Sequence, residues 1–197
     1  MSSSVLWYLS RSTGMVLLVL LSFTAVLGIL IHSRARVQWL PSFAVTGLHR
    51  NASLLAVVLL VIHVATAVLD PFVSISWLSV VVPFTSHYEP VWMGLGALSL
   101  DIMLAVVVTS LLRERIGHRT WRAVHVLNYA MYPLAVVHGI GAASDLQSGV
   151  LLLISVVCVA AVAGAAGWRL VDALRHVPPR RRVVVQLAAA EAVGTRR

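Results

Sequence analysis

The sequence predicts an all-α membrane protein, a bundle of five transmembrane helices with a short interfacial or re-entrant segment at the outer surface. Of its 197 residues, 59% are hydrophobic and 11% are charged, and the mean hydropathy is +0.92. A water-soluble domain of this length cannot bury so much apolar surface. Five apolar stretches are long enough, at roughly 20 residues per crossing, to span the hydrocarbon core: 5–31, 48–69, 92–112, 120–140 and 149–170.

The first stretch is expected to remain in the protein as a helix, because it lacks the basic leader and the small-residue cleavage pattern of a secretory signal. The segment 72–84, between the second and third stretches, is apolar but bounded by Pro71 and Pro83. As a helix it would rise only about 20 Å, so we expect it to lie along the outer surface or to dip into it. We therefore expect a transmembrane domain over 1–175, followed by a basic cytoplasmic tail over 176–197.

The distribution of arginine predicts the orientation. The chain has 15 arginines and no lysine, and alternation of the helices places all of them except Arg11 on one side. The positive-inside rule assigns that side to the cytoplasm, which leaves the N-terminus outside the plasma membrane and the C-terminus inside. Trp7, Trp77 and Trp92 fall at predicted outer ends, where amphipathic rings are favoured. The formal charge of +8 therefore reflects membrane topology rather than nucleic-acid binding.

The composition also limits the chemistry. The single cysteine, Cys158, excludes an internal disulfide, a Cys-ligated iron–sulfur cluster and a covalent c-type haem site, and we expect it to be a small buried apolar residue. No phosphate-binding glycine loop or zinc signature is present. Because the helices leave no room for a nucleotide-binding domain, any FAD or FMN is expected on a separate partner.

Four of the eight histidines form two pairs, His49 and His63 in the second stretch and His125 and His138 in the fourth. Their spacings of 14 and 13 residues separate the members of each pair by roughly 20 Å along a helix. Both helices are expected to run outward, so His49 lies level with His125 and His63 with His138. Imidazole pairs from facing helices hold low-spin b-type haem iron, and two stacked haems carry single electrons. The pattern therefore predicts transmembrane electron transfer through two non-covalent haem b groups.

Two alternatives remain open. Intramembrane histidines also serve as polar contacts between helices or as proton relays, which would suit a non-redox transporter or interaction subunit. A passive haem-containing anchor for a dehydrogenase would differ from an electron conduit only in its partners.

An ideal helix over the fourth stretch would point the side chains of its two histidines to different faces. On an ideal helix, 14 residues return to within about 40° of the starting face, whereas 13 residues leave the second side chain about 140° away. Pro133 lies between His125 and His138 and removes one backbone hydrogen bond. We therefore predict a kink or local change of winding at Pro133.

The opening WYLSRSTG and the five-helix core, with histidines 14 and 13 apart on its second and fourth helices, resemble the ferric reductase-like transmembrane domain that ferric reductases and NADPH oxidases share. The resemblance implies that His49 with His125 ligates an inner haem and that His63 with His138 ligates an outer one. It implies a stand-alone bacterial form, the haem-carrying membrane subunit of an oxidoreductase. A separate flavin-dependent reductase on the cytoplasmic side would donate electrons. The acceptor would be a ferric chelate, oxygen or an extracytoplasmic redox protein.

Four charged residues are further candidates. Arg11 would pair with a propionate of the outer haem, or snorkel to lipid headgroups. Arg50 and Arg122 would pair with propionates of the inner haem, although ordinary cytoplasmic anchoring explains them as well. Asp101 lies near the middle of the third stretch, where a charged carboxylate in lipid costs free energy. Hydrogen bonding to a ligand imidazole, a proton relay and an interhelical hydrogen bond are all open for it.

His87, in the outer loop, would bind a metal substrate or tune the outer haem, unless it is simply solvated. Gly47, Gly139 and Gly141 lie close to the paired histidines in the sequence. Lacking side chains, they would let a porphyrin edge approach the backbone; Gly139 and Gly141 would equally end a helix.

Overall fold

The protein is a bundle of long helices, and the computed structural model describes residues 3–32, 41–143 and 149–175. Within those residues there are helices and no strands, and five helical spans are long and apolar enough to cross a membrane. Four of the spans are continuous helices: α1 (Ser3–His32), α2 (Ser42–Leu69), α4 (Pro90–Leu111) and α8 (Gly149–Arg175). The fifth is divided into α6 (His118–His125) and α7 (Asn128–Ala142). The predicted all-α, five-helix membrane fold is confirmed, whereas the tail 176–197 lies outside the described residues.

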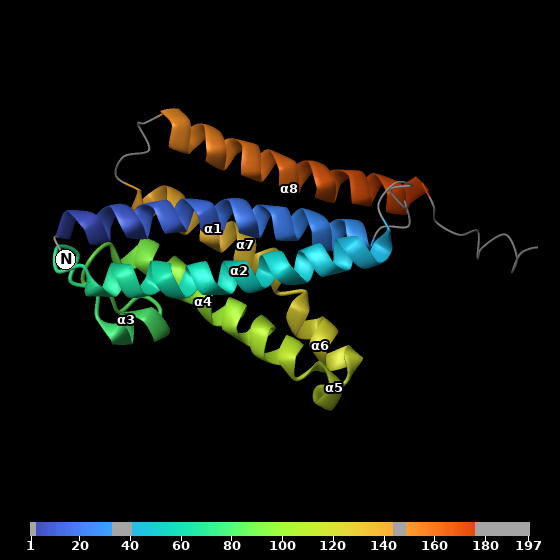
Figure 1. Cartoon of the computed structure of the whole chain (residues 1–197), viewed down its shortest axis with the longest axis horizontal. Helices are drawn as coiled ribbons and strands as arrows, with labels where there is room; N and C mark the ends of the chain where they lie inside the picture. The colour runs from blue at the N-terminus through green and yellow to red at the C-terminus, as the bar shows by residue number, and fades with distance from the viewer. Residues whose placement is uncertain (1–2, 33–40, 144–148, 176–197) are drawn as a thin grey trace, which may run out of the picture.

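Two helix pairs make up most of the bundle. α1 packs along α2, α4 packs along α7, and the two pairs meet where α1 touches α7. Figure 1 shows α8 on the other side of α1 from α2, while α4 slants away from α2 toward its C-terminal end. The helices alternate in direction, so His63 of α2 and His138 of α7 lie toward one end of the bundle. We name this the His63 end and the opposite one the His49 end.

The short apolar segment between α2 and α4 does not cross the bundle. It forms one helix, α3 (Trp77–Val81), whose first turn is capped by Ser76 Oγ, 3.2 Å from the backbone N–H of Ser79. α3 packs against α4 at the His63 end (Figure 1), and the Phe84 ring fills the space beside Gly94 of α4. A second short helix, α5 (Arg113–Ile116), leads into α6.

The buried core is small and lies midway along the helices. Its members come from α1, α2, α4 and α7: Leu17, Leu21, Ala56, Met103 and Met131. A hydrogen bond of 2.8 Å joins Ser22 of α1 to the hydroxyl of Tyr132 of α7 beside this core. Cys158 is buried, as expected. Large apolar side chains such as Val61 and Leu153 remain exposed, because in a membrane protein these faces meet lipid instead of water.

Candidate functional site

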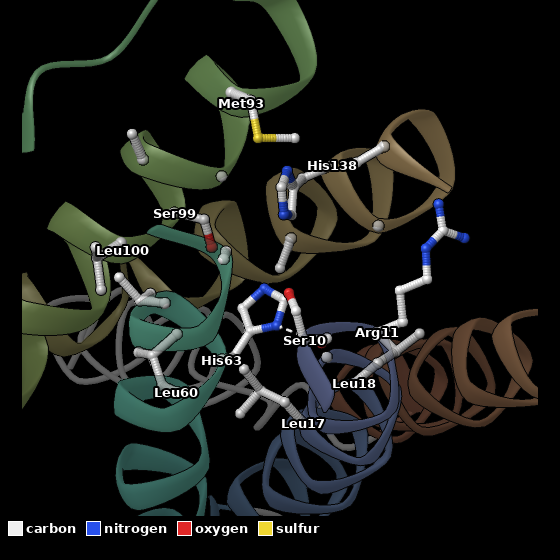
Figure 2. A pocket seen from close by; sticks show the side chains of 18 of the residues that line it. Ser10, Arg11, Leu17, Leu18, Leu60, His63, Met93, Ser99, Leu100 and His138 are labelled. Atoms are coloured by element: carbon white, nitrogen blue, oxygen red, sulfur yellow. Dashed lines mark hydrogen bonds between the residues drawn. The ribbon is translucent and has the colours of Figure 1, made fainter. Parts of the chain in front are cut away.

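Two histidine rings from different helices face each other at the His63 end. The ring centroids of His63 and His138 are 6.4 Å apart, and the ring planes meet at 79°. Figure 2 shows the two side chains approaching from α2 and α7, with Ser10 of α1 beside His63. The structure therefore brings together the two residues that the sequence predicts for one level.

Backbone carbonyls orient both rings. Nδ1 of His63 lies 2.8 Å from the carbonyl oxygen of Ser10 on α1, and Nδ1 of His138 lies 2.8 Å from that of Trp92 on α4. A carbonyl only accepts, so each Nδ1 carries the hydrogen and each Nε2 keeps its lone pair. Such a bond fixes the tautomer and the direction of a metal-binding imidazole.

The separation of these rings fits one metal atom between them. An imidazole nitrogen binds a metal ion at about 2 Å, and about 1 Å more reaches each ring centre, so two rings on one ion lie roughly 6 Å apart. Within 3–32, 41–143 and 149–175 no group of three or more His, Cys, Asp or Glu side chains is placed to hold a metal ion. Two imidazoles suffice for a haem iron, because the porphyrin supplies the remaining nitrogens. The residues present fit a haem.

A cavity of about 310 Å³ opens around the two histidines, within the size range of cofactor sites. Its walls come from α1, α2, α3, α4 and α7 and are mostly apolar, as in typical ligand pockets. The polar side chains among them include Ser10, Arg11, Asp70, Ser79, Tyr88 and Ser99. A mostly dry cavity with a few polar groups suits a large planar cofactor with charged substituents.

At the His49 end the two predicted ligands are held differently. Nδ1 of His49 lies 3.0 Å from the carbonyl oxygen of Thr24 on α1, which repeats the arrangement at His63. The ring of His125 stacks on Trp121, with centroids 4.9 Å apart and planes at 29°, and Trp121 Nε1 donates to Ser110 Oγ at 3.2 Å. The pairing of His49 with His125 stays a prediction.

The fourth span is interrupted between its two histidines, but not at the predicted residue. α6 ends at His125 and α7 begins at Asn128, whereas Pro133 lies inside α7. Around Val126 and Leu127 the backbone forms i to i−3 hydrogen bonds, such as Leu127 N to Val124 O at 2.9 Å. Such 3₁₀-type turns wind more tightly than an α-helix and so reduce the angular mismatch left by 13 residues. A change of winding between the two histidines therefore exists and lies before Pro133, while a kink at Pro133 itself stays a prediction.

The arginine candidates occupy different environments. Arg11 lines the cavity, and its guanidinium lies 4.2 Å from the centroid of the Trp7 ring. Figure 2 shows its long side chain rising from α1 on one side of the two histidines. Arg50 and Arg122 are exposed. Only Arg11 is thus placed at the cavity, while a role for Arg50 and Arg122 toward an inner haem stays a prediction.

Asp101 and His87 are two further candidates. Asp101 is half-buried on α4. Because backbone carbonyls occupy Nδ1 of His49, His63 and His138, Asp101 is not the group that orients these rings. His87 is exposed in the loop before α4, in keeping with a solvated side chain.

The glycines close to the histidines in the sequence have different surroundings. A Cβ atom on Gly141 would strike the Trp92 ring, so this residue accommodates a tryptophan of α4. Gly139 lines the cavity, whereas Gly47 has open space beside it.

Three other glycines, which the sequence reasoning missed, lie against the predicted ligand histidines: Gly14 faces His63, Gly28 faces His49 and Gly96 faces His138. The 14-residue spacing of Gly14 and Gly28 equals that of His49 and His63. These equal spacings of glycine on one helix and histidine on the next are the sequence pattern from which the contacts could have been predicted.

Comparison with known proteins agrees with this architecture. The sequence matches the family described as ferric reductase like transmembrane component over residues 13–136, well over half of the chain. The match includes His49, His63 and His125 and ends two residues before His138. No curated protein and no solved structure matches the chain. With its five membrane-spanning helices and this match, the chain belongs to the ferric reductase-like transmembrane family, whose members carry electrons across membranes.

Proposed function

We propose that this protein is an electron conduit that holds two b-type haems between α2 and the divided α6–α7 span. His63 and His138 ligate the haem at the His63 end, and His49 and His125 ligate the haem at the His49 end. The chain is then the haem-carrying membrane subunit of an oxidoreductase.

The geometry of His63 and His138 carries the proposal. Their rings approach from two helices at a separation that suits a single shared metal atom, beside a largely apolar cavity. Polar contact alone would bring the two rings closer together. A direct hydrogen bond between two imidazoles places their nitrogens about 3 Å apart, whereas two nitrogens that bind one metal ion from opposite sides lie about 4 Å apart. Each Nδ1 is instead already engaged by a backbone carbonyl.

Residues of the chain itself orient the two imidazoles, exclude water and supply charge at the site. The carbonyls of Ser10 and Trp92 keep each imidazole in the tautomer that exposes Nε2. The apolar walls lower the local dielectric and exclude water. Arg11, on the cavity wall, supplies a positive charge for a carboxylate such as a haem propionate. Bound haem supplies one-electron redox chemistry at an iron that both histidines hold.

The charge distribution supports the direction of electron flow, and the family suggests the kind of partner. Cytoplasmic loops are rich in arginine, and the exposed Arg113, Arg115, Arg119 and Arg122 support an orientation with the His49 end at the cytoplasm and the N-terminus outside the plasma membrane. A separate flavoprotein reductase donates electrons at the cytoplasmic surface. They leave at the His63 end to a ferric chelate, oxygen or an extracytoplasmic redox protein.

The haem content of the purified full chain, made with haem available, tests this function. A pyridine haemochrome assay together with dithionite-reduced-minus-oxidised spectra should give two non-covalent b haems per chain. One haem would mean that one of the histidine pairs has been misread. A folded protein without haem would refute electron transfer and leave the histidines as helix contacts or as a proton path in a non-redox membrane protein.

A further inference from the structure

Three of the four ligand histidines rest on the neighbouring helix in the same way. His63 bonds to the carbonyl of Ser10 and faces Gly14, and His49 bonds to the carbonyl of Thr24. Gly28 faces His49 in the same manner. On α4 the corresponding partners of His138 are the carbonyl of Trp92 and Gly96. In each case the glycine lies four residues after the carbonyl, and we name this arrangement a histidine socket.

The helical geometry explains the four-residue offset. Residues i and i+4 lie on one face of a helix, and the Cα–Cβ bond points toward the N-terminus. A side chain at i+4 therefore covers the carbonyl of residue i. That carbonyl accepts the helical N–H of residue i+4 and keeps a second lone pair. Glycine at i+4 uncovers this lone pair, so an imidazole from the next helix can reach it.

The distances show how closely the rings occupy the sockets. A Cβ on Gly14 would lie 2.9 Å from Cε1 of His63, and a Cβ on Gly96 would lie 2.7 Å from Cε1 of His138. Both are closer than carbon atoms pack, and both rings are held by hydrogen bonds. A Cβ on Gly28 would lie 3.5 Å from Cε1 of His49, which is ordinary van der Waals contact. The two sockets at the His63 end exclude a methyl group, and the socket at the His49 end admits one.

The place on α4 that would correspond to a socket for the fourth histidine, His125, offers a comparison. Fourteen residues beyond Trp92 and Gly96 lie Val106 and Ser110, the same step that relates the two sockets of α1. Here Ser110 Oγ donates to the Val106 carbonyl at 2.6 Å and accepts from Trp121. The Ser110 side chain at the i+4 position thus bonds to the carbonyl that glycine would leave uncovered, and the ring of His125 stacks on Trp121.

We propose that Gly14 and Gly96 are positioning residues: by leaving the carbonyls of Ser10 and Trp92 uncovered, they set the tautomer and the direction of the two imidazoles at the His63 end. The inference rests on the proposed haem function and adds a determinant of how one haem is held. It also distinguishes the two ends of the bundle. At the His63 end both histidines face a glycine whose Cβ would clash with the ring, whereas the socket at the His49 end has room for a methyl group.

The test compares four single variants of the full chain with the parent protein. Gly14→Ala and Gly96→Ala add the excluded methyl group, Gly28→Ala adds one where there is room, and Gly164→Ala adds one on α8 where no atom lies within 4 Å. Alanine favours helix over glycine, so a loss does not come from weaker helices. The readouts are haem per chain, the midpoint potential of each haem and the low-spin ferric electron paramagnetic resonance (EPR) spectrum.

We expect Gly14→Ala and Gly96→Ala to affect the same haem. Its content should fall at least twofold, or its midpoint potential and EPR signal should shift while the other haem stays as in the parent. The unaffected haem shows that the variant is folded. Gly164→Ala should retain both haems with parental potentials, and Gly28→Ala should change the haem at the His49 end less than Gly14→Ala and Gly96→Ala change the other haem.

Three results would overturn the inference. Parental content, potentials and spectra in Gly14→Ala and Gly96→Ala would remove the positioning role and leave the proposed function intact. An equal effect of Gly164→Ala, or equal loss of both haems in the two socket variants, would mean a general effect on the bundle. A parent protein without haem would refute the proposed function together with the sockets.

Discussion

Replacing single ligand histidines by alanine tests the pairing of the helices directly. His63→Ala and His138→Ala each remove one of two imidazoles whose centroids are 6.4 Å apart. One imidazole and a mostly apolar cavity hold a haem far less well than two. Each variant should therefore fall from two haems per chain to about one, and both should lose the same spectral component.

The double variant makes the prediction sharper. Because the two side chains act on one iron, removing both should cost no more haem than removing either, which is the non-additivity expected of residues that work as a unit. His49→Ala and His125→Ala should remove the other haem. The exposed His87 offers a matched control, and His87→Ala should keep both.

The distance between the levels predicts the effect on transport. The 14 residues from His49 to His63 correspond to about 21 Å of helix. After loss of either haem an electron would cross most of the membrane without a carrier. Each single variant should thus retain half of the haem and lose transmembrane reduction of an external ferric chelate in proteoliposomes loaded with a reductant.

The assay is a pyridine haemochrome measurement of each variant, combined with a redox titration that identifies the remaining haem. Our reasoning would be refuted if His63→Ala and His138→Ala removed different haems. Loss of both haems in the double variant, with monodisperse protein, would equally contradict separate levels.

Three further predictions concern the surroundings of the haems. Because the two imidazole planes at the His63 end meet at 79°, the ferric haem held there should give a strongly anisotropic low-spin EPR signal with one large-g feature, and a rhombic spectrum typical of parallel rings would contradict this. Arg11→Gln removes a positive charge at the cavity and should lower the midpoint potential of the same haem by on the order of tens of millivolts, whereas Arg115→Gln, on an exposed residue, should not change it. Trp121→Leu removes the ring stacked on His125 and should shift the spectrum or potential of the other haem only, with Trp168→Leu on α8 as the control.

Much of the architecture follows from the sequence alone, because lipid imposes simple rules on a chain. Every backbone polar group in the hydrocarbon core must be paired within its own segment, so length and hydropathy predict the helices that the structure contains. The matched histidine spacings on the second and fourth spans predict which rings share a level. For His63 and His138 the structure confirms the proximity.

Only the tertiary structure decided how those histidines are held. Contacts between helices depend on rotation and crossing geometry, which hydropathy does not encode. The sockets of Gly14 and Gly96 lie on helices other than those of the histidines they contact, and Gly141 accommodates the ring of Trp92. The tighter winding lies at Val126 and Leu127, where the sequence has no proline or glycine to mark it. Sequence determined the spans and the level that His63 and His138 share; packing determined the direction of their imidazoles.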